Sequence, residues 1–180
     1  MKFVKTFLML AAAGAVTLSA ADFFKILNTG RWSKFECTAV TADNALTVTM
    51  PIDHKGGQKE YPIGWPRLYM RKFLPAENNW SGAKAISFDL KLEFTGKTAA
   101  YPLTFHIFWR PKDAKKNEST SVRCPVLKNN AVNKVVIPFS SLKGFDPAVV
   151  CGLGFNISES QFKHGENFKF TVSNFKLVEK

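Results

Sequence analysis

Several short runs of the chain alternate strictly between apolar and polar residues, and this alternation constrains the fold more than any other feature. In AISFDLKLEF, residues 85–94, every second side chain is apolar. Side chains along a β-strand point alternately to its two faces, so such a run predicts a strand with one buried face. Comparable runs occupy 102–109, 134–139, 149–158 and 168–179, and earlier strands are expected within 35–40, 45–50 and 64–73.

Clusters of Gly, Pro, Asn, Asp and Lys separate these runs, and helical periodicity is nearly absent. About eight short strands joined by such turns predict an all-β protein, an antiparallel β-sandwich. Residues 22–180 are long enough for one such domain. Within 168–179 the apolar phase slips near Ser173 and Asn174, which predicts a β-bulge. The side chains expected in the core are Phe88, Leu90, Phe105, Ile107, Ile137, Leu153, Phe155 and Phe170, with Trp80 and Trp109.

The first residues have the pattern of a secretory signal peptide. Lys2 and Lys5 precede an apolar stretch, residues 7–16, that is too short to span a bilayer. We expect cleavage after residue 21 and a secreted, periplasmic or extracellular domain over 22–180, with no transmembrane segment. Removing these two lysines from the formal net charge of +11 leaves +9. This charge favours anionic partners, and without a long lysine run it does not point to nucleic acid.

The strand expected in GWPRLYMRKF, residues 64–73, has an unusual outer face. Arg67, Tyr69 and Arg71 share one side of the alternating run, and Trp65 lies at its edge. A solvated strand face more often carries Thr, Ser, Lys or Glu. Arginine and aromatic side chains are instead enriched where a protein surface contacts a partner. The stretch therefore suggests a binding surface.

Asp89 and Glu93 offer an alternative account of the arginines, because cross-strand ion pairs with them would make this face purely structural. As catalytic carboxylates they are poor candidates. They lie four residues apart on one strand, or roughly 13 Å, whereas glycosidases need about 5–9.5 Å. The three histidines lie on separate segments, and no nucleophile motif occurs. We therefore expect a protein without catalytic activity.

Three segments of the chain resemble a known family. NNWSGAKAISFDLKLEF, VVIPFSSLKGFDPAVVCGLGFNIS and FKFTVSNFKLVEK are similar to segments of β-jelly-roll carbohydrate-binding modules, members of the galactose-binding-like superfamily. The resemblance extends from about Phe35 to the end of the chain. It implies a jelly-roll sandwich with a ligand on a concave sheet face, and fold alone does not determine the ligand.

The chemistry of sugars indicates which side chains could meet that ligand. An aromatic ring can stack on the apolar side of a sugar, and arginine can hold its hydroxyls or its carboxylate. Gly152 and Gly154 have no side chains, so no side chain rises from the outer face of their strand at these positions. This leaves room either for a ligand or for a close neighbour. The expected ligand-binding residues are Trp65, Arg67, Tyr69, Arg71, His106, Arg110 and Asn156.

Modules of this family commonly hold a structural calcium ion between an early acidic residue and an aspartate of the closing strand. Glu36 matches the first position, whereas Asn174 stands where an acidic residue is expected. Calcium prefers carboxylate oxygens. The resemblance therefore allows a calcium site at Glu36 and Asn174, and no cofactor is required.

The cysteines are Cys37, Cys124 and Cys151, so at most one internal disulfide can form. None lies in a CxxC motif. Cys151 falls in the apolar phase of its strand, together with Leu153 and Phe155, and is expected to be buried and unreactive.

These observations favour a secreted, non-catalytic domain that binds a polysaccharide or glycan, and the positive charge favours an acidic one. The alternative is a structural or adhesive exported protein that uses the same fold for protein contacts, and a weaker alternative is an undetected glycan-active enzyme. An exposed cleft of aromatic and arginine side chains favours the first. Arginines held in ion pairs favour the second.

Overall fold

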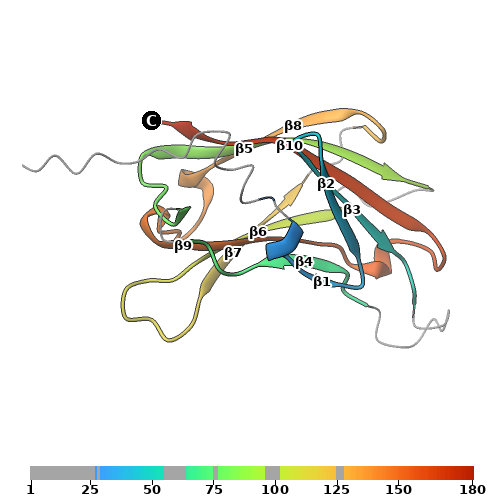
Figure 1. Ribbon diagram of the computed structural model, residues 1–180, viewed down its shortest axis with the longest axis horizontal. Coiled ribbons are helices and arrows are strands. Elements are labelled where there is room, and N and C mark those ends of the chain that lie inside the picture. Colours follow the sequence, from blue (N-terminus) through green and yellow to red (C-terminus); the bar gives the residue numbers. More distant parts are fainter. Residues whose placement is uncertain (1–26, 28, 55–63, 75–76, 96–101, 125–127) are drawn as a thin grey trace, which may run out of the picture.

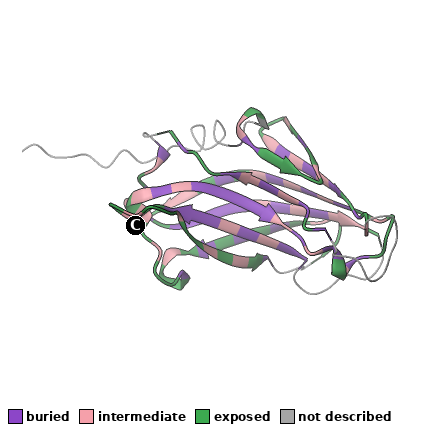
Figure 2. Cartoon of the chain, turned by 90° about the horizontal axis from the view of Figure 1, so that it is seen from below, coloured by how far each residue is buried: buried purple, intermediate pink, exposed green. Residues whose placement is uncertain are grey.

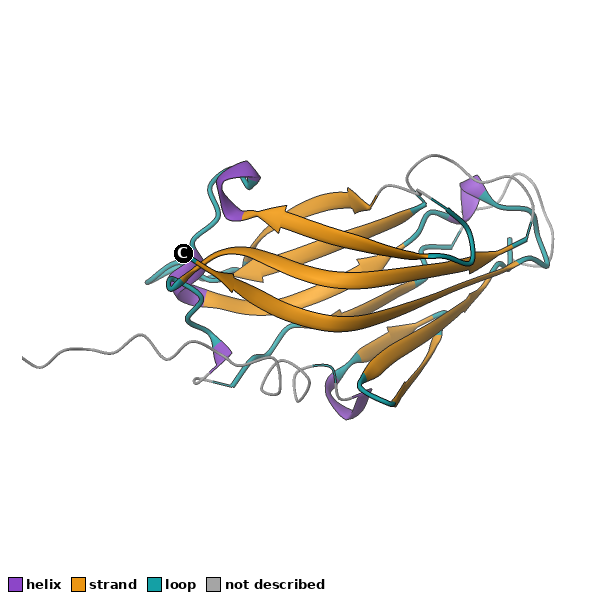
Figure 3. Cartoon of the chain, turned by 90° about the horizontal axis from the view of Figure 1, so that it is seen from above, coloured by secondary structure: helices purple, strands orange, loops and turns teal. Residues whose placement is uncertain are grey.

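Two antiparallel β-sheets lie one above the other in the computed structural model (Figure 1). The structure describes residues 27, 29–54, 64–74, 77–95, 102–124 and 128–180. In this part of the chain strands dominate, and the helices are single short turns (Figure 3). The predicted antiparallel β-sandwich is confirmed. The predicted signal peptide lies outside the described residues.

The first sheet has the strand order β1-β4-β9-β6-β7. Its strands are β1 Ser33–Phe35, β4 Arg67–Met70, β9 Val150–Asn156, β6 Leu103–Trp109 and β7 Glu118–Cys124. The second sheet has the order β2-β3-β10-β5-β8. Its strands are β2 Thr38–Ala42, β3 Ala45–Pro51, β10 Asn167–Glu179, β5 Ala83–Phe94 and β8 Val132–Pro138. The short helices are η1 Thr29–Arg31, η3 Phe139–Ser141, η4 Pro147–Val149 and η5 Glu159–Gln161.

Phenylalanine side chains from both sheets form the centre of the core, and buried residues alternate along the strands (Figure 2). The ring centroid of Phe155 on β9 lies 5.0 Å from that of Phe105 and 5.2 Å from that of Phe170. It also meets Phe88 of the opposite sheet edge-on at 6.3 Å. The eight predicted core side chains other than the tryptophans are each at most 2% exposed, so the predicted strand phases are confirmed there.

Trp80 closes one end of the sandwich, as the sequence predicted, and is 1% exposed. Its ring stacks on Phe139 of η3 at 6.1 Å, and its Nε1 donates to the backbone oxygen of Glu77 at 2.9 Å. The Glu77 carboxylate in turn receives both Nη atoms of Arg31, each at 2.8 Å. This pair connects η1 to the loop before β5. Trp109 is also buried, as predicted.

The structure has more strands than the sequence predicted, because two of them carry weak patterns. The strand expected over 35–40 is broken at Glu36, whose φ of 54° turns the chain from β1 in one sheet into β2 in the other. Strand β7, ESTSVRC, is polar at most positions because it is an edge strand. The bulge predicted near Ser173 and Asn174 is confirmed by a register shift between Ser173 and Lys176. Within the described residues, no helix is long and apolar enough to span a membrane.

Candidate functional site

The strand register of the first sheet places most of the predicted site residues on its outer face. In one row across the sheet, Phe35, Arg67, Asn156 and Thr104 are successive partners, and Arg123 of β7 completes it. In the next row Ser33, Tyr69, Gly154, His106 and Ser121 are successive partners. Residues directly opposite one another in antiparallel strands point to the same side. We call this outer surface the arginine face, made up of Phe35, Trp65, Arg67, Tyr69, Arg71, Thr104, His106, Phe108, Arg123 and Asn156.

Gly154 allows the ring of Tyr69 to lie across strand β9. A Cβ atom added at Gly154 would lie 2.1 Å from Tyr69 Cδ1 and 2.5 Å from Cε1. The ring then meets His106 and Phe108 of β6 edge-on, with centroids 5.6 Å and 5.5 Å away. The space predicted beside the glycines of β9 is therefore occupied at Gly154 by a close neighbour, the ring of Tyr69.

Arg71 lies over this aromatic cluster. Its Cζ is 4.9 Å from the centroid of the Tyr69 ring and 5.1 Å from that of Phe108, so both contacts are cation–π interactions. Phe108 is 7% exposed although it points outward, because the neighbouring side chains cover it. Arg71 itself is exposed. The rings thus hold an outward-facing guanidinium in a defined place.

The Tyr69 hydroxyl is a hydrogen-bond donor at neutral pH. Burial raises the pKa of Tyr69, and the positive charges of Arg67 and Arg71 only partly oppose that shift. The hydroxyl therefore keeps its proton well into the alkaline range.

His106 and Asn156 form a polar pair on the same face. His106 Nε2 donates a hydrogen bond to the side-chain oxygen of Asn156, which joins β6 to β9. Burial lowers the pKa of His106; the bond to Asn156 opposes this shift, and the charge of Arg71 adds to it. The imidazole is therefore neutral at pH 7, and its Nδ1 is a hydrogen-bond acceptor.

The other end of the face combines Arg67 with two exposed aromatic side chains. The Arg67 Cζ lies 4.3 Å from the centroid of the Phe35 ring, and its Nη1 donates to the backbone oxygen of Trp65 at 3.2 Å. Trp65 is 62% exposed and Phe35 is 43% exposed. Large aromatic side chains are seldom this accessible, so this end offers apolar surface beside a positive charge.

The alternative in which the arginines pair with Asp89 or Glu93 is wrong. Both carboxylates lie on β5, which belongs to the second sheet, and their outward face is on the opposite side of the molecule. Asp89 accepts a hydrogen bond from Asn174 at 2.6 Å, and Glu93 lies 3.4 Å from Lys169. The sheet assignment therefore separates these acids from the arginine face.

A pocket of about 400 Å³ adjoins the arginine face where β4, β9 and β6 meet the loops that flank them. Arg110, predicted as a site residue, lies at the pocket together with Arg71. The sequence did not predict the other lining residues, because the complete lining is assembled from four separate segments of the chain. The lining residues are Arg71, Lys72, Phe73, Asn78, Arg110, Ala148, Val149 and Cys151.

The prediction that Cys151 is buried in the core is wrong. Phe108 pairs with Gly152 and Trp109 pairs with Val150, so Cys151 is an extra residue in β9. This β-bulge turns its side chain out of the core, and the half-buried thiol lines the pocket. Burial raises the pKa of Cys151, although the charge of Arg110 opposes the shift.

All three cysteines are free thiols in the structure. The Cys37 thiol donates to the backbone oxygen of Arg67 at 3.3 Å. Cys124 is completely buried, and burial raises its pKa to about 12.

The two calcium candidates do not come together. Glu36 lies two residues before β2, whose first residue pairs with Thr49 of β3. Asn174 follows the residue that pairs with Ala45 at the other end of β3, and its side-chain nitrogen donates to Asp89. Four residues of strand, roughly 13 Å, separate these levels. The two residues cannot ligate one cation, and among the described residues no cluster of three or more His, Cys, Asp and Glu side chains is arranged to hold a metal.

Gly154→Ala tests whether the Tyr69 ring packs directly against the backbone of Gly154. We expect the added methyl group to displace the ring, with a loss of about 1–3 kcal/mol in the free energy of unfolding, as for other overpacked sites. Urea denaturation measures that loss, and two-dimensional NMR follows the signals of Tyr69 and His106. Ser121→Ala, an exposed position in the same row, is the control and should change neither. An unchanged stability and spectrum in Gly154→Ala would contradict this arrangement.

Comparison with known proteins places this face on a recognised class of fold. No protein-family model matches the sequence, and the comparison with curated proteins finds no match. Solved structures do match. A family 11 carbohydrate-binding module from Clostridium thermocellum, in complex with a β-1,3-1,4-mixed-linked tetrasaccharide, superposes with a TM-score of 0.52 at 18% identity, over 83% of this chain and 89% of that one.

A second neighbour is the family 30 carbohydrate-binding module of a cellulosomal cellulase from Clostridium thermocellum. It matches with a TM-score of 0.50 at 16% identity, over 83% of this chain and 87% of that one. These likenesses confirm that the fold is the β-sandwich found in carbohydrate-binding modules, as the sequence segments indicated. At such identities they describe the fold alone.

Proposed function

We propose that residues 22–180 form an exported, non-catalytic domain that binds a glycan on the arginine face. The observation that carries the proposal is the composition of that face. It presents exposed Trp65 and half-buried Tyr69 beside several arginines and a neutral His106–Asn156 pair. Aromatic rings with planar donors are what a sugar ring with hydroxyl groups requires. The carbohydrate-binding modules with a similar fold support the same proposal.

The charges of the face favour an acidic glycan. The register places Arg67 and Arg123 in one row. Arg71 lies over the Tyr69 ring of the next row. In the described strands of this sheet, the positions that share the outward side with these residues carry no carboxylate. A surface of one charge sign attracts ligands of the opposite sign and speeds their association. A carboxylate or sulfate group on the sugar would complement it.

A glycan array with residues 22–180, read at low and high salt, tests the proposal. On the ligand that it selects, Tyr69→Ala should weaken binding of neutral and acidic forms alike, since it removes the apolar platform. Arg67→Ala should weaken binding of the acidic form by about ten- to a hundredfold at low salt, the size of one charge-assisted contact. That difference should shrink as salt screens the pair. Isothermal titration calorimetry gives each affinity.

Lys134→Ala, with the same change of charge on the outer face of the second sheet, is the matched control and should bind like the wild type. Absence of binding to every glycan on the array would contradict the proposal and favour an adhesive role in protein contacts. Wild-type affinity in both Tyr69→Ala and Arg67→Ala would show that the ligand binds elsewhere.

A further inference from the structure

The pocket beside the arginine face is built by backbone hydrogen bonds between its own walls. Phe73 N donates to Cys151 O at 3.1 Å, and Arg110 N donates to Val149 O at 3.0 Å. Val150 N donates to Asn78 O at 2.9 Å. These bonds join the segments after β4 and β6 to β9 and to the loop that leads to β5. The walls are therefore held in place before any ligand arrives, which reduces the entropic cost of binding.

Glycine and the bulge create the space inside these walls. A Cβ atom at Gly152 would lie 2.1 Å from the backbone oxygen of Met70, so β9 and β4 approach closely at that level. The next residue toward the loop, Cys151, is the extra residue of the bulge and faces the pocket. The volume of about 400 Å³ lies within the range of about 300–1,000 Å³ typical of small-molecule sites.

Every charged side chain in the lining is positive, namely Arg71, Lys72 and Arg110. None of the described lining residues is acidic, so the pocket wall itself supplies no counter-ion for these three positive charges.

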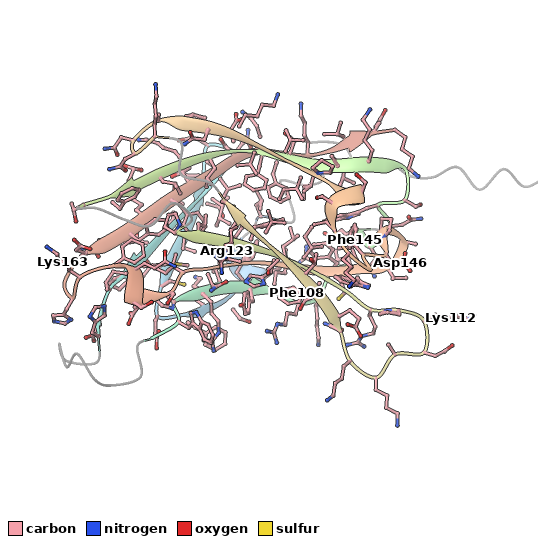
Figure 4. All side chains as sticks on the ribbon, turned by 180° about the vertical axis from the view of Figure 1, so that it is seen from behind. Phe108, Lys112, Arg123, Phe145, Asp146 and Lys163 are labelled. Atoms are coloured by element: carbon pink, nitrogen blue, oxygen red, sulfur yellow. The ribbon has the colours of Figure 1, made fainter. Side chains whose placement is uncertain are left out.

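Both arginines can direct donors into the pocket. The Nε of Arg110 donates to Asn117 at 2.7 Å within the loop that joins β6 to β7, which fixes the plane of its guanidinium. This loop projects beyond the sheet with Lys112 on it (Figure 4). Arg71 is held over the rings of Tyr69 and Phe108. A guanidinium presents parallel N–H donors that match the two oxygens of a carboxylate or sulfate.

We infer that this pocket is a subsite for the oxyanion group of a glycan, the carboxylate of a uronic acid or the sulfate ester of a sulfated sugar. The inference rests on the proposed function, because it places the charged sugar unit of the glycan next to the sugar ring that stacks on Tyr69. Arg71 belongs to both the face and the pocket, and it connects the two contacts. Arg110 belongs to the pocket and not to the rows of the face. A substitution of Arg110 therefore tests the pocket contact without changing the contact on the face.

The first test is a glycan array in which each uronate oligosaccharide is printed beside its methyl ester and each sulfated one beside its desulfated form. We expect the acidic member of the tightest pair to bind more strongly, and the uronate and sulfate arms show which source the pocket accepts. Calorimetry on that pair then compares variants. Arg110→Ala should weaken binding of the acidic member by about ten- to a hundredfold and leave the neutral member unchanged.

Lys116→Ala is the control, because Lys116 is exposed on the same loop and is absent from the lining. It should bind both members like the wild type. The Cys151 thiol provides a second readout, since the acidic member should slow its modification by N-ethylmaleimide, measured by peptide mass spectrometry, and the neutral member should do so less.

If the wild type binds the acidic and neutral members equally well, the proposed subsite is wrong, whereas glycan binding itself still stands. An Arg110→Ala variant that binds the acidic member like the wild type would lead to the same conclusion. If no glycan binds at all, the proposed function itself fails.

Discussion

Phe155→Ala is expected to lower the free energy of unfolding by about 3–5 kcal/mol, the range for removing a buried aromatic ring and leaving a cavity. The Phe155 side chain is completely buried, and rings of both sheets surround it, including Phe88, Phe105 and Phe170. No side chain nearby can fill the space without leaving its own place in the core. Chemical denaturation of residues 22–180, followed by tryptophan fluorescence, measures the loss.

Val136→Ala is the comparison for this experiment, because Val136 is 50% exposed on an outer strand position. It should cost less than about 0.5 kcal/mol, as most exposed substitutions do. A loss below about 1 kcal/mol in Phe155→Ala would show that β9 does not direct this side chain into the core.

Glu77→Gln is expected to produce the second large loss, about 2–4 kcal/mol, because it leaves the Arg31 guanidinium without its carboxylate in a mostly buried place. Both Nη atoms of Arg31 bind Glu77 at 2.8 Å, and Leu74 N donates to the same carboxylate at 2.6 Å. The exposed fractions of the side chains are 26% for Arg31 and 8% for Glu77. Thermal and urea denaturation at pH 7 measure the difference.

The pH dependence gives this prediction a second, independent outcome. Burial acts to raise the pKa of Glu77, but the hydrogen bonds from Arg31 and Leu74 N outweigh it, so the pKa lies below its ordinary value. A carboxyl group with a lowered pKa stabilises the fold above its unfolded-state pKa, and that contribution is lost as the pH falls through the folded-state value. The wild type should therefore lose part of its advantage over Glu77→Gln on acidification below pH of about 4.

Glu179→Gln is the matched control, since it makes the same chemical change at an exposed position near the end of β10. It should leave stability at pH 7 unchanged. The difference in the free energy of unfolding between the wild type and Glu77→Gln should shrink at low pH. If this difference stays constant down to the lowest pH at which the protein folds, the role of the ionised carboxylate is contradicted.

The sequence predicted the layers of this fold because alternation is a local property that each strand carries by itself. AISFDLKLEF places Phe88 and Leu90 in the core whatever its neighbours are, and both are fully buried. Cys151 was misplaced because a β-bulge depends on how β9 pairs with β6, and one extra residue inverts the apparent phase. Strand β7 was missed because an edge strand needs no apolar face of its own.

The members of the candidate site were easier to predict than their contacts. Arg67, Tyr69 and Arg71 are recognisable within one strand, but the seat of Tyr69 on Gly154 depends on the pairing of β4 with β9. Ion pairs with Asp89 could not be excluded from the sequence, because strand order alone does not reveal which sheet contains β5. The pocket escaped prediction for the same reason, since its lining is assembled only after the sheets form.

The two glycines of β9 restrict how the specificity of this surface can change during evolution or directed mutagenesis. A methyl group would meet Met70 O at Gly152 and the Tyr69 ring at Gly154, each at 2.1 Å, so the central strand cannot acquire new side chains there. Variation in ligand preference must therefore come from Asn156 at the end of β9 and from the flanking strands, at positions such as Arg67 and Thr104. A mutant library that randomises these outward positions and leaves Gly152 and Gly154 intact would sample the folded variants of this surface most efficiently.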